Sequence, residues 1–392
     1  MRVLHYEPAI RLELGGVVRA VLDIAAEQAK AGAKVTLVTH DAKDVPSDFP
    51  GTVKVIPGPG ILGRLGSGTA SARSLCQEND VIHLHGAWSL ANLQWAEIAV
   101  QSGCAYFVSP HGMLDDWCME QKSLKKKFFL RFGGRRWLER ASGVHLTATA
   151  EERQSKKWAP LMRSFVCPLP MDLGPFQEIP PHSMAASVEP AYAEEPPVVL
   201  FLSRLHEKKR PELLIEVAKE LKSEATIVLA GDGDPDYVES LKRQASGTTV
   251  RFPGFVRGPA KVAMYAHAAC FALPTSQENF GYVLFEALAA GVPVLTTKGA
   301  DTWPEMEASG GAIILEASVD AFCAAIRHQI AVPEESKKKG AKGRSWALRN
   351  LDAQAATPQQ WAGPCRNAQD LLQSQPHACP KIWSTAWLRL EQ

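Results

Sequence analysis

The stretch PTSQENFGYVLFEALAAGVPVLTT, residues 274–297, predicts a loop, a buried helix, a turn and a short strand. Residues 281–290 are almost wholly apolar, which is typical of a helix buried on all sides. Gly291 stands where a glycine ends a helix, and Pro293 follows it. The β-branched run that ends at Thr297 then predicts a strand.

Glu286 is the one charge inside this apolar helix, and Glu278 lies eight residues before it. A buried carboxylate without partners costs several kcal/mol or takes up a proton, so Glu286 requires hydrogen-bond donors. An arginine from elsewhere or the hydroxyls of a ligand would serve. Thr275 and Glu278 also match a capping box, which would make Glu278 a helix cap. The pair flanking one helix start favours ligand binding over these structural roles.

Three amides, of Asn279, Phe280 and Gly281, fall near the predicted helix start. A helix N-terminus offers free N–H groups and a partial positive charge, and both favour a phosphate. This stretch therefore has the groups to hold a hydroxylated, phosphorylated ligand.

The 392 residues exceed one ordinary core and predict two domains. Strands and helices alternate twice, over residues 1–170 and 198–332, which predicts two parallel α/β sheets with a cleft between them. The proline-rich residues 171–197 between them predict an extended linker. Residues 333–392 form a tail that we could not order, with a helix returning to the first domain as one option.

Bulk composition excludes several classes of protein. The net charge of +1 gives no global field for nucleic acid, and the 46% hydrophobic fraction is that of a globular protein. Eight scattered cysteines without a C-x-x-C pair indicate reduced thiols of a cytoplasmic protein. Neither a signal peptide nor a membrane-spanning run is visible in the sequence.

Several further residues are candidates because they follow predicted strands, where open α/β sheets bind ligands. Gly15 and Gly16 follow the first strand and could cradle a phosphate or simply admit a close helix. His111 follows a strand at residues 104–109, and an ordinary loop histidine is the alternative. Arg204 and Lys209 follow the strand at 198–203, where cations suit a diphosphate, although HEKKR is also an ordinary charged turn.

Two other patterns have weaker support. His83 and His85 share a strand face and could ligate a metal, but no third ligand stands at useful spacing, so we predict no metal site. Residues 122–140, KSLKKKFFLRFGGRRWLER, mix cations with aromatics, which suits an anionic membrane surface or acceptor. A solvated basic helix interrupted by Gly133 and Gly134 is the commoner explanation of such a run.

As a set, these motifs resemble the family 4 retaining glycosyltransferases with the GT-B fold, over about residues 1–330. The resemblance rests on the GG loop, DVIHLHG at 80–86, SPHGMLDDW at 109–117, FLSRLHEKKRPELLIEV at 201–217, VLAGDGD at 228–234, VRFPGFV at 250–256 and the E-x7-E pair. SPHGML is particularly similar to members that build bacterial surface polysaccharides. One departure is Arg210, where the family usually has glycine.

The resemblance implies a hexosyltransferase-type enzyme with two Rossmann-like domains, a nucleotide-diphosphate sugar as donor, and neither cofactor nor metal. It implies that Glu286 holds the ribose, that Glu278 and His111 contact the donor sugar, and that Arg204 and Lys209 neutralise the leaving diphosphate. It also gives donor contacts to the Gly16 loop, to the amides of residues 279–281 and to Val256 beside the base.

The expected acceptor is a glycan or a lipid-linked oligosaccharide, met in the cytoplasm or at the inner membrane face. Retention would come from same-face attack, in which the leaving phosphate accepts the proton, or from double displacement with Glu278 as nucleophile. A nucleotide-sugar 2-epimerase on the same fold, or a non-catalytic nucleotide-sugar binder, are the alternatives.

Overall fold

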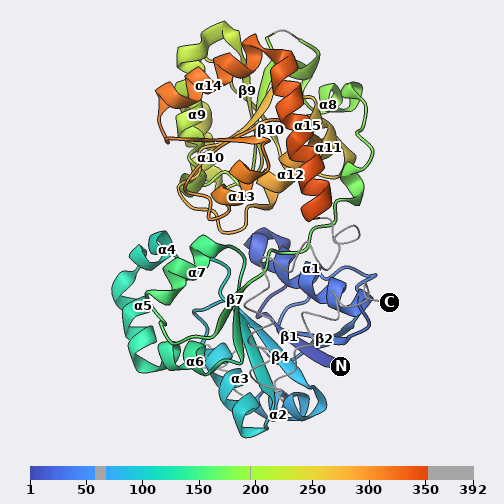
Figure 1. Ribbon diagram of the computed structural model, residues 1–392, viewed down its shortest axis with the longest axis vertical. Coiled ribbons are helices and arrows are strands. Elements are labelled where there is room, and N and C mark those ends of the chain that lie inside the picture. The colour runs from blue at the N-terminus through green and yellow to red at the C-terminus, as the bar shows by residue number, and fades with distance from the viewer. Residues whose placement is uncertain (58–67, 195, 352–392) are drawn as a thin grey trace. The chain divides into compact units, whose positions relative to one another are not determined.

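The computed structural model describes residues 1–57, 68–194 and 196–351. Within these residues the chain divides between Met171 and Asp172 into two compact units, each with its own sheet (Figure 1). All strand pairs in both sheets are parallel. The prediction of two parallel α/β sheets is therefore confirmed.

The N-terminal unit holds a seven-stranded sheet in the order β3-β2-β1-β4-β5-β6-β7. Its strands are β1 (Arg2–Tyr6), β2 (Lys34–Thr39), β3 (Thr52–Val55), β4 (Val81–His85), β5 (Ala105–Ser109), β6 (Gly143–Leu146) and β7 (Ser164–Val166). Its helices are η1 (Leu12–Leu14), α1 (Gly16–Lys30), α2 (Thr69–Glu78), α3 (Leu90–Gln101), α4 (Asp116–Glu120), α5 (Ser123–Phe129), η4 (Leu130–Gly134), α6 (Arg135–Arg140) and α7 (Thr149–Lys156). We had not predicted β3 and α2.

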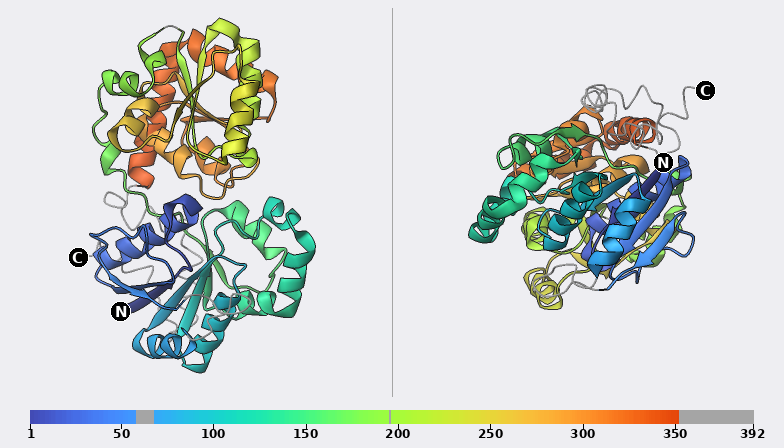
Figure 2. Two further views of the ribbon diagram at one scale, coloured as in Figure 1. Left: turned by 180° about the vertical axis from the view of Figure 1, so that it is seen from behind. Right: turned by 90° about the horizontal axis from the view of Figure 1, so that it is seen from below.

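The C-terminal unit holds a six-stranded sheet in the order β10-β9-β8-β11-β12-β13. Its strands are β8 (Val198–Leu202), β9 (Thr226–Ala230), β10 (Arg251–Gly254), β11 (Cys270–Leu273), β12 (Val294–Thr297) and β13 (Ala312–Leu315). Its helices are η5 (Gly174–Phe176), α8 (His182–Val188), η6 (Pro190–Ala193), η7 (Glu207–Lys209), α9 (Pro211–Leu221), η8 (Lys222–Glu224), α10 (Pro235–Gln244), α11 (Gly258–Ala266), α12 (Tyr282–Ala290), α13 (Trp303–Ala308), α14 (Val319–Ala331) and α15 (Pro333–Asn350). Within each unit, helices flank the sheet when the chain is seen from the front and from behind (Figures 1 and 2).

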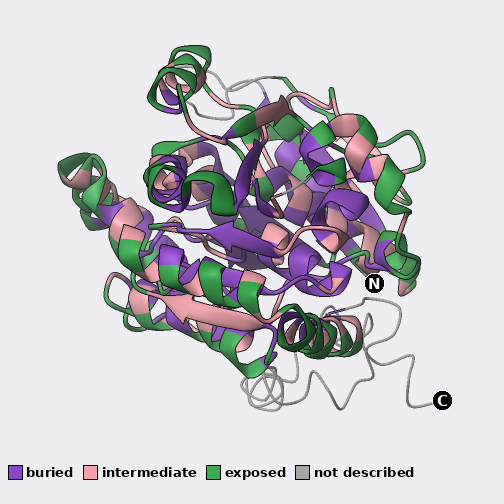
Figure 3. Cartoon of the chain, turned by 90° about the horizontal axis from the view of Figure 1, so that it is seen from above, coloured by how far each residue is buried: buried purple, intermediate pink, exposed green. Residues whose placement is uncertain are grey.

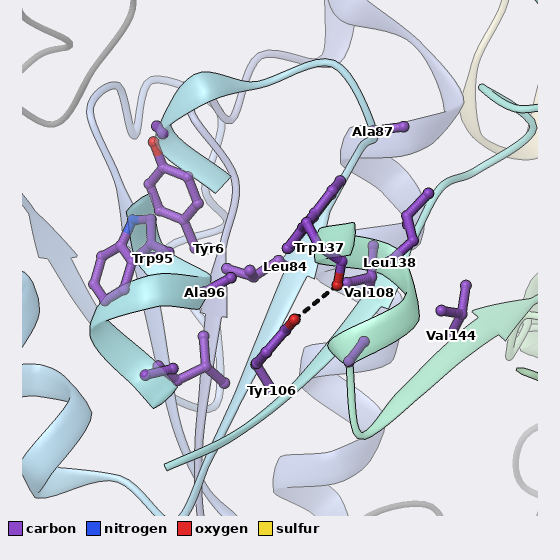
Figure 4. Packing of buried hydrophobic residues seen from close by; sticks show 14 of the residues in the cluster. Tyr6, Leu84, Ala87, Trp95, Ala96, Tyr106, Val108, Trp137, Leu138 and Val144 are labelled. Atoms are coloured by element: carbon purple, nitrogen blue, oxygen red, sulfur yellow. Dashed lines mark hydrogen bonds between the residues drawn. The ribbon is translucent and has the colours of Figure 1, made fainter. Parts of the chain in front are cut away.

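The two faces of the N-terminal sheet differ in chemistry. One face carries Leu4, Tyr6, Leu84 and Val108 and packs on α2, α3 and α6 in a large apolar cluster (Figure 4). There the Tyr106 hydroxyl donates to the Trp137 carbonyl at 2.7 Å. Because strand side chains alternate, the intervening residues face the other way, toward α1. Buried residues line the strands of both units, while exposed residues gather on the outer turns of the helices (Figure 3).

The segment 171–197 is not extended, so that part of the linker prediction is wrong. It forms η5, α8 and η6 and packs on α11: the Tyr192 hydroxyl donates to the Met264 carbonyl at 2.7 Å, and Pro180 O lies 2.9 Å from His267 Nε2. Phe176 and Tyr192 are buried. Prolines at the first turns of η5 and η6 are compatible with helix, because a first-turn N–H needs no partner within the helix.

Helix α15 begins just after the point where the sequence pattern faded, and it packs on α12 within the same unit. The contact is close because glycines form it: a Cβ on Gly343 would come within 2.9 Å of Gly311 Cα, and one on Gly340 would meet Gly291 O. Glycine lowers helix propensity, which explains the weak helix signal in this part of the sequence. The helix suggested to return to the first domain from residues 333–392 is not α15, which packs within the C-terminal unit, and the rest of that range, residues 352–392, lies outside the described residues.

Candidate functional site

The loops after β8 and β11 meet at the carboxyl edge of the C-terminal sheet. Strands β9 and β10 are added in sequence order on one side of β8, and β11, β12 and β13 are added in sequence order on its other side. This is the switch point at which open α/β sheets bind ligands. Lys208 O accepts hydrogen bonds from Ser276 N at 2.7 Å and from the Thr275 hydroxyl at 3.1 Å. The two predicted loops are thus joined directly.

Lys209 and Glu278 form an ion pair at this edge. Lys209 is almost fully buried, while Glu278 keeps a fifth of its side chain exposed. Burial lowers the pKa of Lys209 well below its ordinary value, and the charges of Lys208 and Arg204 act in the same direction. The Glu278 carboxylate opposes them. The two residues predicted to meet the donor sugar and the diphosphate therefore lie side by side.

The loop that carries Glu278 is fixed by main-chain contacts. Glu278 N donates to Gly299 O at 2.9 Å, and Asp301 N donates to Glu278 O at 2.8 Å. Gly281 ends the loop with φ 74°, and a Cβ there would lie 2.9 Å from Glu278 Cγ. Only glycine fits this left-handed position without moving Glu278. Helix α12 starts at Tyr282, too far from Thr275 for the predicted capping box, so that alternative is wrong.

Two backbone amides before α12 have no acceptor among the described residues. Within the described residues, the Phe280 and Gly281 amides donate no hydrogen bond. Phe280 is buried, and its carbonyl accepts from the Thr302 hydroxyl at 3.0 Å. The side chain of Asn279 reaches Asp301 at 3.5 Å. This arrangement leaves donors at a helix start, as the sequence predicted.

Glu286 has its own partners within the unit. Its Oε1 accepts from Lys261 Nζ at 2.7 Å, and its Oε2 accepts from the Tyr265 hydroxyl at 3.2 Å. Both donors come from α11, one turn apart, and the Glu286 side chain is 5% exposed. The sequence predicted an arginine or the hydroxyls of a ligand as the donors to Glu286, and it did not predict Lys261. An apolar helix with one acid should have prompted a search for a cation on the neighbouring helix.

Arg204 and Val256 are two further residues of the C-terminal unit that the sequence predicts to bind the donor. Arg204 follows β8, is exposed, and forms no ion pair among the described residues. Val256 follows β10 and is buried, whereas the adjacent Phe255 is 66% exposed. The Gly231 turn after β9 passes so close to Ser203 that a Cβ would overlap the Ser203 carbonyl. A side chain at 231 would therefore displace the strand end that positions Arg204.

Gly15, Gly16 and His111 belong to the N-terminal unit. Gly15 has φ 98° and precedes α1, so its conformation requires glycine. A Cβ on Gly16 would meet no atom within 4 Å, so the unit leaves open space there. His111 has φ 53°, in the left-handed region, and is half-buried. Sequence reasoning missed the residue that holds its loop: the buried carboxylate of Glu151 accepts from Gly112 N at 2.6 Å.

His83 and His85 have a third histidine beside them, so the statement that no third ligand stands near them is wrong. His5 pairs in register with His83 across β1 and β4, and ligand atoms of His5, His83 and His85 all lie within 4.8 Å of one another. Spacing along one strand cannot show a neighbour that comes from the next strand. These three imidazoles could hold a metal, although each also makes hydrogen bonds within the protein.

Comparison with known proteins agrees with this geometry. Residues 15–164 match the family described as "Glycosyl transferase 4-like domain", and residues 186–346 match "Glycosyl transferases group 1". Together these matches cover most of the chain. The chain belongs to the GT4-like glycosyltransferases of the GT-B fold.

Two curated relatives show the range of the family. A GDP-mannose-dependent alpha-(1-6)-phosphatidylinositol monomannoside mannosyltransferase of Mycolicibacterium smegmatis is 35% identical over 170 residues, 39% of this chain and 44% of that protein. A D-inositol 3-phosphate glycosyltransferase of Xylanimonas cellulosilytica is 31% identical over 170 residues, 40% of each chain. The matched part thus spans less than half the length of these relatives.

Solved structures share the fold over nearly the whole chain. HepE of Anabaena, in complex with UDP and glucose, has a TM-score of 0.75 at 19% identity and covers 96% of this chain and 100% of its own. WaaG, a glycosyltransferase involved in lipopolysaccharide biosynthesis, has a TM-score of 0.67 at 17% identity and covers 94% and 99%. Among the described residues, no helix is both long and apolar enough to cross a membrane.

Proposed function

We propose that this glycosyltransferase transfers a hexose from a nucleotide-diphosphate sugar to a glycan or lipid-linked oligosaccharide acceptor, with retention of configuration, in surface polysaccharide biosynthesis. The observation that carries the proposal is the Lys209–Glu278 pair beside exposed Arg204, at the switch point of the C-terminal sheet. The UDP and glucose bound to HepE, which shares the fold, support a donor of this class.

The cations fit the chemistry of a departing diphosphate. Glycosyl transfer builds positive charge on the sugar and negative charge on the leaving group, and fixed opposite charge is usually the largest catalytic contribution. Arg204 offers a planar fork of donors that forms no ion pair within the described residues, and buried Lys209 offers a point charge. The amides of Phe280 and Gly281 add partial positive charge. These groups supply the stabilisation for which other transferases use a metal ion, so we propose a metal-independent reaction.

Glu286 and Val256 would bind the nucleoside. A carboxylate has about four lone-pair sites, so Glu286 can accept ribose hydroxyls in addition to Lys261 and Tyr265. The hydrogen bond from Lys261 orients the carboxylate. Glu278, held by Lys209, would contact the sugar. Of the two routes to retention we propose same-face attack, because an ion-paired Glu278 is a poorer nucleophile than a free carboxylate.

An exposed apolar and basic surface on α5 and η4 supports contact with an anionic membrane. Leu124, Phe128 and Phe132 are 84%, 64% and 68% exposed, and the cations Lys125, Lys127 and Arg131 are exposed beside them. Aromatics flanked by cations are typical of interfacial helices. We expect the protein to sediment with vesicles containing anionic lipid and not with neutral ones. Phe128→Ser with Phe132→Ser should abolish sedimentation, and full binding by that variant would contradict the membrane contact.

The proposed function is tested with donors and with Arg204. Thermal-shift screening against UDP, GDP, ADP and their sugars should identify the donor, because a ligand at about 100 times its Kd stabilises the folded state by about 2.7 kcal/mol. With that donor, Arg204→Ala should lower kcat more than donor affinity, by about tenfold or more. Activity should survive EDTA.

A matched control is Arg243→Ala, since Arg243 is an exposed arginine of the same unit on α10. It should leave kcat unchanged. If Arg204→Ala changes affinity alone, Arg204 has no role at the leaving group. Turnover of the donor without any acceptor would favour the 2-epimerase, and donor binding without turnover by any acceptor would favour the non-catalytic binder.

A further inference from the structure

Three imidazoles and an amide form a continuous hydrogen-bonded chain through the N-terminal unit. Gln28 of α1 lies 2.8 Å from His5 Nε2, measured at its amide oxygen. His5 Nδ1 lies 3.0 Å from His85 Nε2, and His85 Nδ1 lies 2.9 Å from His111 Nε2. The chain crosses from α1 through β1 and β4 to the loop after β5. The chain thus connects buried Gln28 to His111, the residue that the sequence predicts to contact the donor sugar.

A second chain on the same sheet face has its direction fixed by the main chain. His145 Nε2 lies 2.7 Å from the Cys167 carbonyl, which can only accept, so His145 carries its proton on Nε2. His145 Nδ1 then accepts from the Ser109 hydroxyl at 2.8 Å, and Ser109 Oγ accepts from His83 Nε2 at 2.7 Å. The Cys167 carbonyl therefore determines that both His145 and His83 are protonated on Nε2.

Each of the two ring-to-ring hydrogen bonds needs one N–H group and one lone pair, and neutral imidazoles supply both. Burial lowers the pKa of His5 to about 4, although its bond to Gln28 acts the other way. Burial and the nearby His145 lower the pKa of His111 to about 3, and burial lowers that of His85 well below its ordinary value. A neutral imidazole has one donor and one acceptor nitrogen. The hydrogen bonds of three such rings in series can therefore run in either of two directions, with every ring protonated on Nδ1 or every ring protonated on Nε2.

The direction of hydrogen-bond donation along the three rings depends on whether the oxygen or the nitrogen of the Gln28 amide faces His5. Oxygen and nitrogen of an amide are assigned from the hydrogen bonds they make. With the oxygen toward His5, the Gln28 Nε2 group is buried without any partner among the described residues. A buried unpaired N–H group is rarer and more costly than an unpaired carbonyl. The opposite orientation lets Nε2 donate to His5 Nε2 and leaves only the oxygen unpaired.

We propose that Gln28 is a positioning residue: its amide donates to His5 and directs the chain so that His111 carries its proton on Nδ1. His5 Nδ1 then donates to His85 Nε2, and His85 Nδ1 donates to His111 Nε2. Within the described residues no hydrogen bond reaches His111 Nδ1. This nitrogen is the one left to contact a ligand, and it is an N–H donor.

The consequence for catalysis rests on the proposed function. There, His111 Nδ1–H would donate to an oxygen of the donor sugar, whereas the opposite tautomer would present a lone pair to that oxygen. The Nδ1–H group needs no protonation step to do so. Gln28 therefore acts on the substrate through two intervening rings and never touches it.

The tautomers are measured by nitrogen-15 NMR on the full chain labelled at histidine. The expected result for the wild type is a protonated Nδ1 on His5, His85 and His111. Gln28→Met removes the amide but keeps the length of the side chain, and His111 should then populate the Nε2–H form. With the identified donor, kcat should fall about tenfold, equivalent to about 1.4 kcal/mol, because part of the enzyme presents the wrong nitrogen.

Two controls accompany the variant. His83 and His145 should keep their Nε2–H tautomers in Gln28→Met, because the Cys167 carbonyl fixes them. Gln101→Met, an exposed glutamine of the same unit, should change nothing. A wild-type His111 protonated on Nε2 would overturn the proposal, as would a His111 tautomer that Gln28→Met leaves unchanged. The wild-type measurement holds even if the variant fails to fold. A correct tautomer in a protein without transferase activity would refute the proposed function alone.

Discussion

The two units bury polar side chains in different ways. The N-terminal unit buries four histidines, His5, His83, His85 and His145, and joins them with half-buried His111, through Ser109 and Gln28, into hydrogen-bonded chains. The C-terminal unit instead buries two ion pairs, Lys209–Glu278 and Lys261–Glu286. Neutral chains avoid the cost of desolvating a charge, but they depend on no ring gaining a proton. Ion pairs depend instead on both partners being present, because removing one leaves a buried charge without compensation.

The largest expected effect of this difference is a separate acid unfolding of the N-terminal unit. Burial lowers the folded-state pKa of His5, His83, His85, His111 and His145 below 6.5, so below that pH the unfolded chain binds protons that the folded unit does not. Burial raises the pKa of Glu7 to about 8, which opposes one histidine because the folded unit keeps that proton. Stability therefore rises with pH between about 4.5 and 6.5, with a limiting slope near 5 kcal/mol per pH unit.

Such a slope removes the stability of an ordinary domain within one or two pH units. We expect the peptides of β1, β4 and β5 to lose hydrogen-exchange protection between about pH 6 and pH 5, after correction for the intrinsic exchange rate. The peptides of β8, β9 and β11 should stay protected over that range. Simultaneous loss of protection in both units would show that the histidine chains do not set the acid limit.

A smaller effect is expected from breaking one ion pair of the C-terminal unit. Lys261→Met removes the cation that pairs with the buried Glu286 carboxylate and leaves the hydrogen bond from the Tyr265 hydroxyl, which should cost about 3 kcal/mol of unfolding free energy. Urea unfolding followed by hydrogen exchange in α11 and α12 measures the loss. Adding Glu286→Leu should recover most of it, because the double variant has no uncompensated charge.

Lys242→Met is the matched control. Its ion pair with Glu239 on α10 has both side chains about half exposed, so the change should be too small to resolve in urea unfolding. If Lys261→Met is as mild as this control, the ion pair with Lys261 is not what stabilises Glu286 in the folded unit.

The fold was predictable because its signals are local. Short β-branched runs alternate with helices, and glycines and prolines mark the ends, so most strands begin and end within two residues of their predicted positions. β3 was missed because its four residues, TVKV, are partly exposed and lack an apolar run. α15 was missed because its glycines serve a contact with Gly311 and Gly291 that no local pattern announces.

The site was predictable only where its residues lie near one another in sequence. Glu278, Gly281 and Glu286 lie within one stretch of sequence, and Lys209 was predicted because it follows a strand. Partners from distant elements were missed: Lys261 for Glu286, Glu151 for the His111 loop, and Gln28 and His5 for His85. Strand register and helix packing bring these together, and neither can be derived from one sequence without its fold.

The smallest expected effect concerns Arg210, where the resemblance led us to expect glycine. The structure gives Arg210 φ 54° and ψ 48°, the left-handed conformation that glycine adopts without strain. A residue other than glycine loses about 1–2 kcal/mol of folding stability in this conformation. Glycine has no such strain, but its more flexible unfolded chain offsets part of the gain. Arg210→Gly should therefore stabilise the C-terminal unit by about 0.5–1 kcal/mol in urea unfolding. Arg243→Gly, in the last turn of α10, should instead destabilise, by less than the roughly 1 kcal/mol that glycine costs in a helix interior. If Arg210→Gly also destabilises, the Arg210 side chain contributes more than its backbone strain costs, and the turn that presents Lys209 to Glu278 depends on that side chain.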